Sequence, residues 1–194
     1  LTEKVFGFRL KLVDYLAFVS MFEEIFIRNV YYFEAEKDNP SICDCGANIG
    51  IALLYFKKMY PNCKVIAFEP DEKAYRLLKV NVEVNQFKNV RLVKAAVYKE
   101  EGFVNFYYGK EGAYSLSMSV QKYRSKPVSF KKVESVLLSS YLEKRLDFLK
   151  IDIEGAESFV MDELFASGKL KIIKECVFEY HHHIKTNEDA LGKT

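Results

Sequence analysis

The sequence predicts an α/β fold with a mostly parallel sheet and helices on both faces. From residue 41 onward, short apolar runs alternate with amphipathic stretches, which is typical of consecutive βαβ units. The composition is 49% hydrophobic and 29% charged, which excludes disordered and low-complexity classes and indicates a buried core. The length of 194 residues fits one domain of this class better than two.

We divide the chain into an N-terminal helical extension, residues 1–40, and a main domain, residues 41–194. Residues 8–33 contain no Gly or Pro and repeat apolar side chains at helical spacing, which predicts one amphipathic helix. A short strand is expected at 31–33. A polar loop follows and ends at Pro40, which cannot continue a helix.

An aromatic stripe marks the predicted N-terminal helix, because Phe18, Phe22 and Phe26 recur at a spacing of four residues. Stripes of this kind usually face a core, so we expect a helical layer packed on the main domain. The alternative is that the stripe grips a lipid or another hydrophobic substrate. Charged residues interrupt the apolar stretch, so no membrane span, which needs roughly 18 uncharged residues, is expected.

In the main domain, apolar runs predict strands and amphipathic runs predict helices. We expect strands of the parallel sheet at 41–45, 64–68, 90–97, 147–153 and 172–180. We expect helices at 49–60, 71–85, 136–142 and 156–166, and a further helix that begins at Thr186. An inserted hairpin region, with short strands at 103–108, 114–120 and 128–133, separates the third strand from the fourth.

The turn between the first strand and the first helix has the sequence DCGANIG, residues 44–50. Glycines there permit positive φ and a close approach of a ligand to the backbone, and the helix start offers unpaired N–H groups to an anion. The dehydrogenase pattern G-x-G-x-x-G is not met, because its second and third glycines are replaced by Asn48 and Ile51. A nicotinamide dinucleotide is therefore disfavoured.

Acidic residues follow two other predicted strands at the same edge of the sheet. Glu69 comes at the end of the second strand, where a carboxylate can accept two hydrogen bonds from a ribose diol. Asp152 and Glu154 end the fourth strand. Because ligands of open α/β sheets bind outside the carboxyl ends of the strands, these features together predict a site for an adenosine-containing cofactor.

These motifs resemble those of the FkbM-type S-adenosylmethionine-dependent methyltransferases. The resemblance runs from about residue 41 to residue 181 and rests on the segments 44–50, 68–70, 95–97, 149–157 and 178–181 and on Asn81 and Asn85. It implies a class I methyltransferase fold, which is Rossmann-like, and S-adenosylmethionine as the cofactor. The contacts that it implies for the cofactor are Asp44, Gly46, Asn48, Gly50, Glu69 and Ala96. It also implies transfer to a hydroxyl oxygen of a sugar, a lipid or a secondary metabolite.

Sheets of this class end with a β-hairpin after the fifth parallel strand, whereas this chain stops at Thr194. We expect either that the hairpin is missing or that the fold is a trimmed variant. The first residue is Leu1 and not Met, so we expect the sequence to be a fragment of its gene product.

Methyl transfer to an alcohol requires a group that takes the hydroxyl proton. We assign this catalytic role to Asp152 or Glu154, which share a strand face if the strand runs that far, with His181 as the alternative base at the end of the fifth strand. Glu157 is expected to stabilise the start of the next helix. We assign no metal, although a divalent ion bound by the carboxylates is an alternative.

Charge and cysteine content bear on partners and location. The net charge of +2 provides no global field for nucleic acid. The basic stretch at 122–132 is expected to be a solvated face, and the alternative is that it meets a phosphorylated or nucleic-acid acceptor. The four cysteines are too few for a disulfide framework, so we expect a cytoplasmic protein with Cys43 and Cys45 as buried thiols.

The expected acceptor is a small molecule or glycan. Ser115 and Ser117 in the inserted region are candidates for contact with it. A nucleic-acid methyltransferase and a noncatalytic adaptor that retains the fold are the alternatives.

Overall fold

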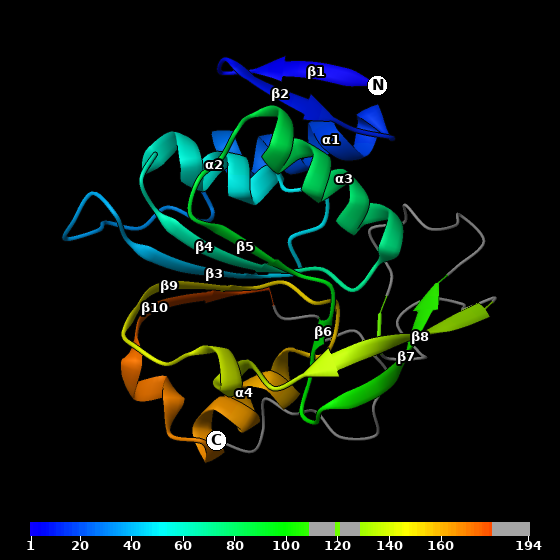
Figure 1. Cartoon of the computed structure of the whole chain (residues 1–194), viewed down its shortest axis with the longest axis vertical. Helices are drawn as coiled ribbons and strands as arrows, with labels where there is room; N and C mark the ends of the chain where they lie inside the picture. Colours follow the sequence, from blue (N-terminus) through cyan, green and yellow to red (C-terminus); the bar gives the residue numbers. More distant parts are fainter. Residues whose placement is uncertain (109–118, 121–128, 180–194) are drawn as a thin grey trace.

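The computed structural model describes residues 1–108, 119–120 and 129–179. At its centre lies a five-stranded sheet with the strand order β10-β9-β3-β4-β5 (Figure 1). The strands are β3 (Ser41–Cys45), β4 (Lys64–Phe68), β5 (Val90–Val93), β9 (Leu146–Ile151) and β10 (Ile173–Phe178). Every pairing in this sheet is parallel. The predicted α/β fold with a mostly parallel sheet is confirmed.

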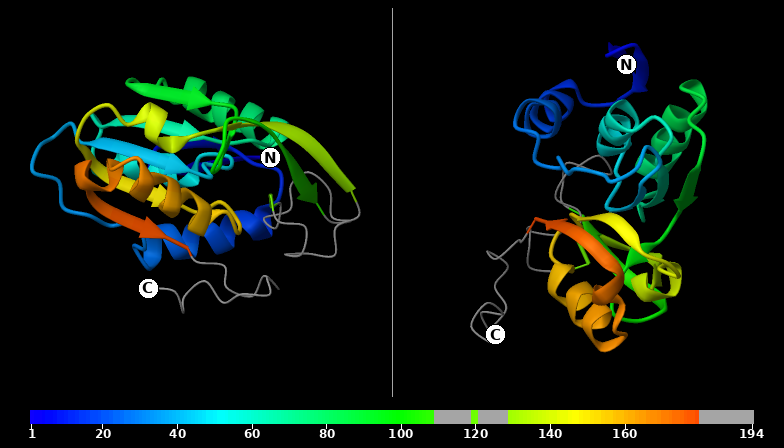
Figure 2. Two further views of the ribbon diagram at one scale, coloured as in Figure 1. Left: turned by 90° about the horizontal axis from the view of Figure 1, so that it is seen from below. Right: turned by 90° about the vertical axis from the view of Figure 1, so that its left-hand side faces the viewer.

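Helices cover both faces of this sheet (Figure 2). One face carries α1 (Tyr15–Phe22), α2 (Ile51–Met59) and α3 (Glu72–Val84), and the other carries α4 (Glu157–Ala166) and the short 3-10 turn η3 (Lys169–Ile172). Strand residues alternate between the two cores: Ile42 and Phe148 pack on the α2 side, whereas Cys43 and Cys45 pack on the α4 side as buried thiols. No helix within the described part of the chain has the length and apolar character needed to cross a bilayer.

A second sheet lies beyond the carboxyl ends of the parallel strands (Figure 1). It contains β6 (Ala96–Val97), β8 (Ser129–Val136) and β7 (Gly102–Tyr108), in that order. The predicted strand at 90–97 is therefore split, because Ala96 pairs with Ser135 of β8 and leaves the main sheet. The predicted helix at 136–142 is also wrong, because β8 extends to Val136 and only a 3-10 turn, η2 (Leu138–Tyr141), follows.

Two predicted elements in other parts of the chain fall wholly or mostly outside the described residues. The helix expected from Thr186 lies entirely outside them. Of the strand expected at 114–120, only Ser119 and Val120 are described, and Ser119 forms an isolated antiparallel bridge with Tyr107.

The N-terminal segment differs from the single helix predicted at 8–33. It begins with an antiparallel hairpin of β1 (Thr2–Val5) and β2 (Phe8–Lys11). Phe6 and Gly7 form the turn at φ values of 49° and 90°, as a two-residue hairpin turn requires. The helix begins only at Tyr15 and continues as a π-helical segment, η1 (Glu23–Ile27). Residues 31–33 form no strand.

The hairpin is fixed to α3 by two asparagine side chains. Asn81 Oδ1 accepts the N–H of Lys11 at 2.6 Å, and its Nδ2 donates to the Lys11 carbonyl at 3.0 Å. Asn85 makes the same pair with the backbone of Arg9, at 2.7 and 2.6 Å. These amides thus pair with β2 as a neighbouring strand would.

The aromatic stripe of the N-terminal helix packs against the core of the main domain, as expected. Phe18 is buried, and the Phe22 and Phe26 rings stack with centroids 5.0 Å apart. Phe26 meets Tyr55 of α2 edge to face at 5.3 Å. The stripe therefore attaches α1 and η1 to α2.

A substitution at Phe33 tests whether the N-terminal segment unfolds together with the sheet. Its ring stacks on Phe148 of β9 at 4.5 Å and is 3% exposed. We expect Phe33→Ala to lower the free energy of unfolding in urea by about 3–5 kcal/mol. Tyr32→Ala is the matched control, because Tyr32 is 56% exposed, and it should change this free energy by less than about 0.5 kcal/mol. Equal effects of the two variants would contradict a shared core.

Candidate active site

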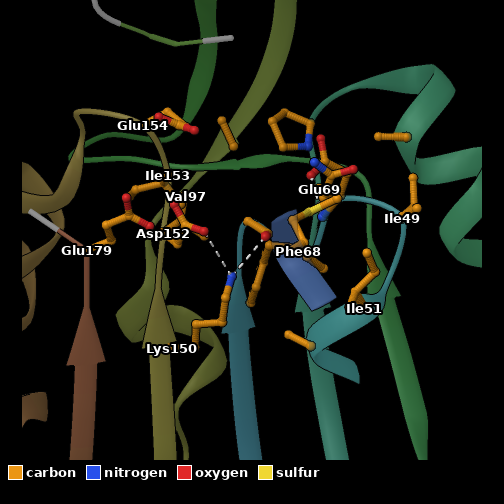
Figure 3. Close-up of a pocket in the computed structure, with 18 of the residues that line it drawn as sticks. Ile49, Ile51, Phe68, Glu69, Val97, Lys150, Asp152, Ile153, Glu154 and Glu179 are labelled. Atoms are coloured by element: carbon orange, nitrogen blue, oxygen red, sulfur yellow. Dashed lines mark hydrogen bonds and ion pairs between the residues drawn. The ribbon is translucent and has the colours of Figure 1, made fainter. Parts of the chain in front are cut away.

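A cavity of about 570 Å³ lies at the carboxyl ends of β3, β4 and β9 (Figure 3). This volume is in the range of small-molecule and cofactor sites. Its walls come from the turn after β3, the end of β4, β6, the segment after β9 and the N-terminal segment. The predicted ligand edge of the sheet is therefore hollowed.

The turn after β3 passes under the segment that follows β9. Gly46 has a φ of +85°, and a Cβ there would lie 1.8 Å from the carbonyl oxygen of Asp152. The N–H groups of Gly46 and Ala47 donate to the Phe68 carbonyl at 3.0 and 2.9 Å. Because of this positive φ and the close Asp152 carbonyl, only glycine fits at position 46.

Gly50 has a different role from Gly46. It lies at the start of α2 with a φ of +95°, and a Cβ there would come within 2.8 Å of Leu78 Cδ1 on α3. It does not line the cavity. Gly50 therefore lets α2 start and pack closely on α3, and the prediction that it contacts a cofactor has no support from its position.

Glu69 lines the cavity at the end of β4 and is held by two backbone donors. Its Oε2 accepts the N–H of Asn48 at 2.9 Å, and its Oε1 accepts the N–H of Asp71 at 2.7 Å. Glu69 is 7% exposed, and this burial raises its pKa to about 7, although both N–H groups lower it. The Glu69 carboxyl therefore titrates near neutral pH.

A buried lysine links the turn to the fourth parallel strand. Lys150 stands beside Asp44 in the register of β9 and β3, and its Nζ lies 3.0 Å from Asp44 Oδ1 and 3.7 Å from Asp152 Oδ2 (Figure 3). It also donates to the Gly46 carbonyl at 3.0 Å. Burial by itself lowers the pKa of Lys150, but Asp44 and Asp152 raise it well above its ordinary value. Lys150 therefore stays charged at 3% exposure.

Asp44 and Tyr31 both lie close to the Lys150 ammonium. Asp44 does not line the cavity, and among the described residues its buried Oδ2 has no hydrogen-bond partner. The ring of Tyr31, from the N-terminal segment, lies 5.3 Å from Lys150 Nζ. Lys150 is not among the residues predicted from the sequence, although a lysine two residues before Asp152 in an apolar run indicates that the two side chains point the same way.

The candidate base residues lie on one side of the cavity. Asp152, Glu154 and Glu179 line it together, opposite Glu69 (Figure 3). The strand does not run far enough for Asp152 and Glu154 to share a strand face, because β9 ends at Ile151 and Glu154 has a φ of +60°. Both carboxylates nevertheless reach the cavity. His181, the alternative base, lies outside the described residues.

Other predicted residues take the positions expected of them. Ala96 is buried on β6 and lines the cavity beside Val97 and Phe106. Glu157 begins α4, and its Oε1 accepts the N–H of Gly155 at 2.9 Å, which supports the predicted role at the helix start.

The basic stretch is not simply a solvated face. Lys131 of β8 forms an ion pair with Asp71, a fully buried residue that also caps the start of α3. Lys132 is exposed, as expected. The more N-terminal basic residues of the stretch, together with Ser115 and Ser117, lie outside the described residues.

One wall of the cavity was not anticipated from the sequence. It comes from the N-terminal segment, and we name it the N-terminal wall: Val13, Asp14, Ala17, Met21, Glu24 and Ile25. Burial, followed by the charges of Glu179 and Asp152, raises the pKa of Glu24, so these carboxylates lie near one another. The only available signal was the helical spacing of these residues beside the aromatic stripe.

The chain is similar to a protein family, to curated proteins and to a solved structure. The family model described as the methyltransferase FkbM domain matches residues 44–192. Methyltransferase sdnD of Sordaria araneosa is 29% identical, over 73% of this chain and 66% of that protein. The 2-O-methyltransferase NoeI of Sinorhizobium fredii is 25% identical, over 72% and 61%. The solved structure of methyltransferase FkbM from Methylobacillus flagellatus KT aligns with 70% of this chain and 31% of that chain, at 16% identity and a TM-score of 0.48. The chain thus spans slightly less than two thirds of these curated relatives.

The ion pairs of Lys150 with Asp44 and Asp152 predict that removing the buried ammonium strongly lowers the stability of the fold. Lys150→Met leaves Asp44 buried without its counter-charge and should lower the free energy of unfolding by about 3–5 kcal/mol. Lys64→Met, at an exposed position of β4, is the control and should have little effect.

Adding Asp44→Asn to Lys150→Met should recover part of this loss, because it removes the uncompensated charge. Urea denaturation measures Lys150→Met, Asp44→Asn, the double variant and the control Lys64→Met. If the double variant instead loses the sum of the two single losses, the ion pair is not the cause.

Proposed function

The chain belongs to the family of methyltransferases with an FkbM domain, and we propose that it transfers a methyl group from S-adenosylmethionine to a hydroxyl oxygen of a sugar, a lipid or another small molecule. The observation that carries this proposal is the convergence of Gly46, Glu69 and Asp152 on one cavity at the carboxyl edge of a parallel sheet. The 2-O-methyltransferase NoeI, one of the relatives, supports oxygen as the acceptor atom.

The residues of the cavity suit this cofactor. Glu69 offers a carboxylate to a ribose diol, and the turn at Gly46, which only glycine allows, forms part of the cavity wall. Asp44, Asp152 and Lys150 together carry one net negative charge. Such a field favours a cationic ligand group.

The chain's own residues would handle the acceptor. Asp152 and Glu154 are the carboxylates placed to orient an acceptor hydroxyl and take its proton. Lys150 would hold Asp152 at a constant distance from the turn, since its ammonium contacts both. When bound, S-adenosylmethionine supplies an electrophilic methyl group. An in-line displacement then depends mainly on how rigidly these groups are positioned.

The titration of Glu69 gives the first test of the cofactor assignment. A carboxylate accepts hydrogen bonds from a diol better than a carboxylic acid does, so binding should favour ionised Glu69. With a pKa of about 7, the affinity for S-adenosylhomocysteine should rise about tenfold from pH 6 to pH 8 and level off above that. Isothermal titration calorimetry measures this dependence.

Glu69→Gln is the control for the pH dependence. It should weaken binding by about 1.5–3 kcal/mol and remove most of the pH dependence. Binding of NADH or ATP in place of S-adenosylhomocysteine would overturn the cofactor assignment. A pH dependence that persists in Glu69→Gln would assign it to another group.

The proton acceptor is tested by turnover with labelled S-adenosylmethionine on a panel of hydroxylated acceptors. Asp152→Asn should lower turnover by about 10²- to 10⁴-fold while affinity for S-adenosylhomocysteine changes little. Asp162→Asn, on the exposed side of α4, is the matched control. If Asp152→Asn and Glu154→Gln both retain wild-type turnover, the base is not one of these carboxylates, and His181 becomes the candidate to test.

A further inference from the structure

We propose that a groove beside the N-terminal hairpin is a second ligand site, and that it takes a small aromatic molecule carrying an anionic group. The groove has a volume of about 430 Å³, which is in the range of small-molecule sites. Among the described residues, it shares none of its lining with the cavity at the carboxyl ends of the strands. The inference therefore goes beyond the proposed methyltransferase function and does not rest on it.

The groove lies between the hairpin and the ends of two helices. The β1–β2 hairpin lies over α3 (Figure 1), and the groove is formed by its turn, the last turn of α2 and the segments that follow α2 and α3. Asn85, which also lines it, fixes the hairpin through the backbone of Arg9. We name it the hairpin groove and define it by the side chains of Phe6, Phe8, Lys57, Lys58, Pro61 and Phe87.

Three phenylalanine rings give the hairpin groove an aromatic surface. Phe8 of the hairpin and Phe87 after α3 meet edge to face, with their centroids 5.2 Å apart, and both remain partly exposed. Phe6 of the turn is 55% exposed. Aromatic rings interact favourably with a further ring in edge-to-face or offset-stacked arrangements. The surface therefore suits a ligand that contains an aromatic ring.

Phe6 occupies a backbone position that does not suit phenylalanine. Its φ is 49°, and a hairpin turn with positive φ at this position favours asparagine or glycine, because a bulky side chain strains the left-handed backbone. The ring is only partly covered by Phe22 and Phe26, at centroid distances of 6.0 and 5.2 Å. Natural proteins most often break such a local rule at functional sites. A bound ring on Phe6 gives the residue a role that explains its position.

Two consecutive lysines of α2 make the hairpin groove electropositive. Lys57 is 3% exposed, and its ammonium donates to the carbonyls of Cys63 and Lys88 at 2.7 Å each, with no ion pair to a carboxylate among the described residues. A buried charge is usually paired with an opposite charge, so the positive potential of Lys57 is left uncompensated. Lys58 is exposed, and its Nζ lies 4.5 Å from the centroid of the Phe6 ring.

These charges select the second property of the ligand. None of the described residues that line the groove is acidic. An anionic group beside Lys58 would form a charge-assisted contact and would also be attracted by the buried charge of Lys57. Because Lys58 lies over the Phe6 ring, the anionic group and the aromatic ring would lie side by side. A carboxylate, sulfonate or phosphate on an aromatic ring matches both properties.

Two fluorescent probes with one aromatic skeleton test this inference. The probe 8-anilinonaphthalene-1-sulfonate is anionic, and N-phenyl-1-naphthylamine has the same skeleton without the sulfonate. Lys58→Met should weaken binding of the anionic probe by at least about threefold and should change binding of the neutral probe by less than about twofold, because it removes a charge and keeps an apolar side chain.

Phe6→Asn removes a ring of the groove while it relaxes the turn. We expect it to weaken both probes by at least about threefold, since both lose an aromatic contact. The hairpin should be retained, because asparagine suits the left-handed backbone at this position. Melting curves measure whether the variant folds, and Phe87→Leu, which removes a ring but keeps an apolar side chain, replaces Phe6→Asn if it does not.

Two exposed positions outside the hairpin groove provide matched controls. Lys79→Met removes a lysine of α3 that is 62% exposed, and Phe103→Asn removes a ring of β7 that is 75% exposed. Both should leave the affinities for the two probes unchanged. A loss of the anionic probe alone in Lys58→Met, together with a loss of both probes in Phe6→Asn, supports the inference. Unchanged binding of the anionic probe in Lys58→Met, or equal losses in the groove variants and the controls, overturns it.

Discussion

The buried ammonium of Lys150 is the interaction on which the geometry of the site depends. Asp44 is buried on β3 and Asp152, which follows β9, is partly buried; without a cation between them the two carboxylates would repel each other. Lys150 also holds the Gly46 carbonyl. One side chain thus sets the spacing of the glycine turn from the candidate base, and the Tyr31 ring from the N-terminal segment lies against it.

The face of the sheet that carries Lys150 explains why the N-terminal segment matters to the site. Lys150 and Phe148 project toward it, so Tyr31 and Phe33 meet the sheet through a cation–π contact and a ring stack. The hairpin is held separately by Asn81 of α3. Because both ends of the segment are attached, α1 is placed beside the cavity, where its polar and aliphatic face becomes a wall.

Local sequence patterns predict the central strands correctly but do not predict the structure of the N-terminal segment. The strands at 41–45 and 64–68 were predicted with the observed bounds, since each is a largely apolar run ended by a turn signal. Residues 8–11 were assigned to a helix, but alternation of Phe8 and Leu10 with charged residues and the glycine at position 7 indicate a hairpin. Glycines and acidic residues at strand ends are local signals, and they were enough to predict where the cavity lies. The ion pairs of Lys150, the place of Glu24 in the cavity wall and the packing role of Gly50 arise from contacts between segments distant in the sequence, which local signals do not reveal.

A crystal structure of the protein with S-adenosylhomocysteine tests the account most directly, because it locates the ligand relative to Glu69 and the N-terminal wall. The account predicts the ribose hydroxyls on the Glu69 carboxylate and the sulfur directed toward Asp152. A ligand bound outside this cavity, or with its adenosine on the N-terminal wall and its ribose away from Glu69, would contradict it.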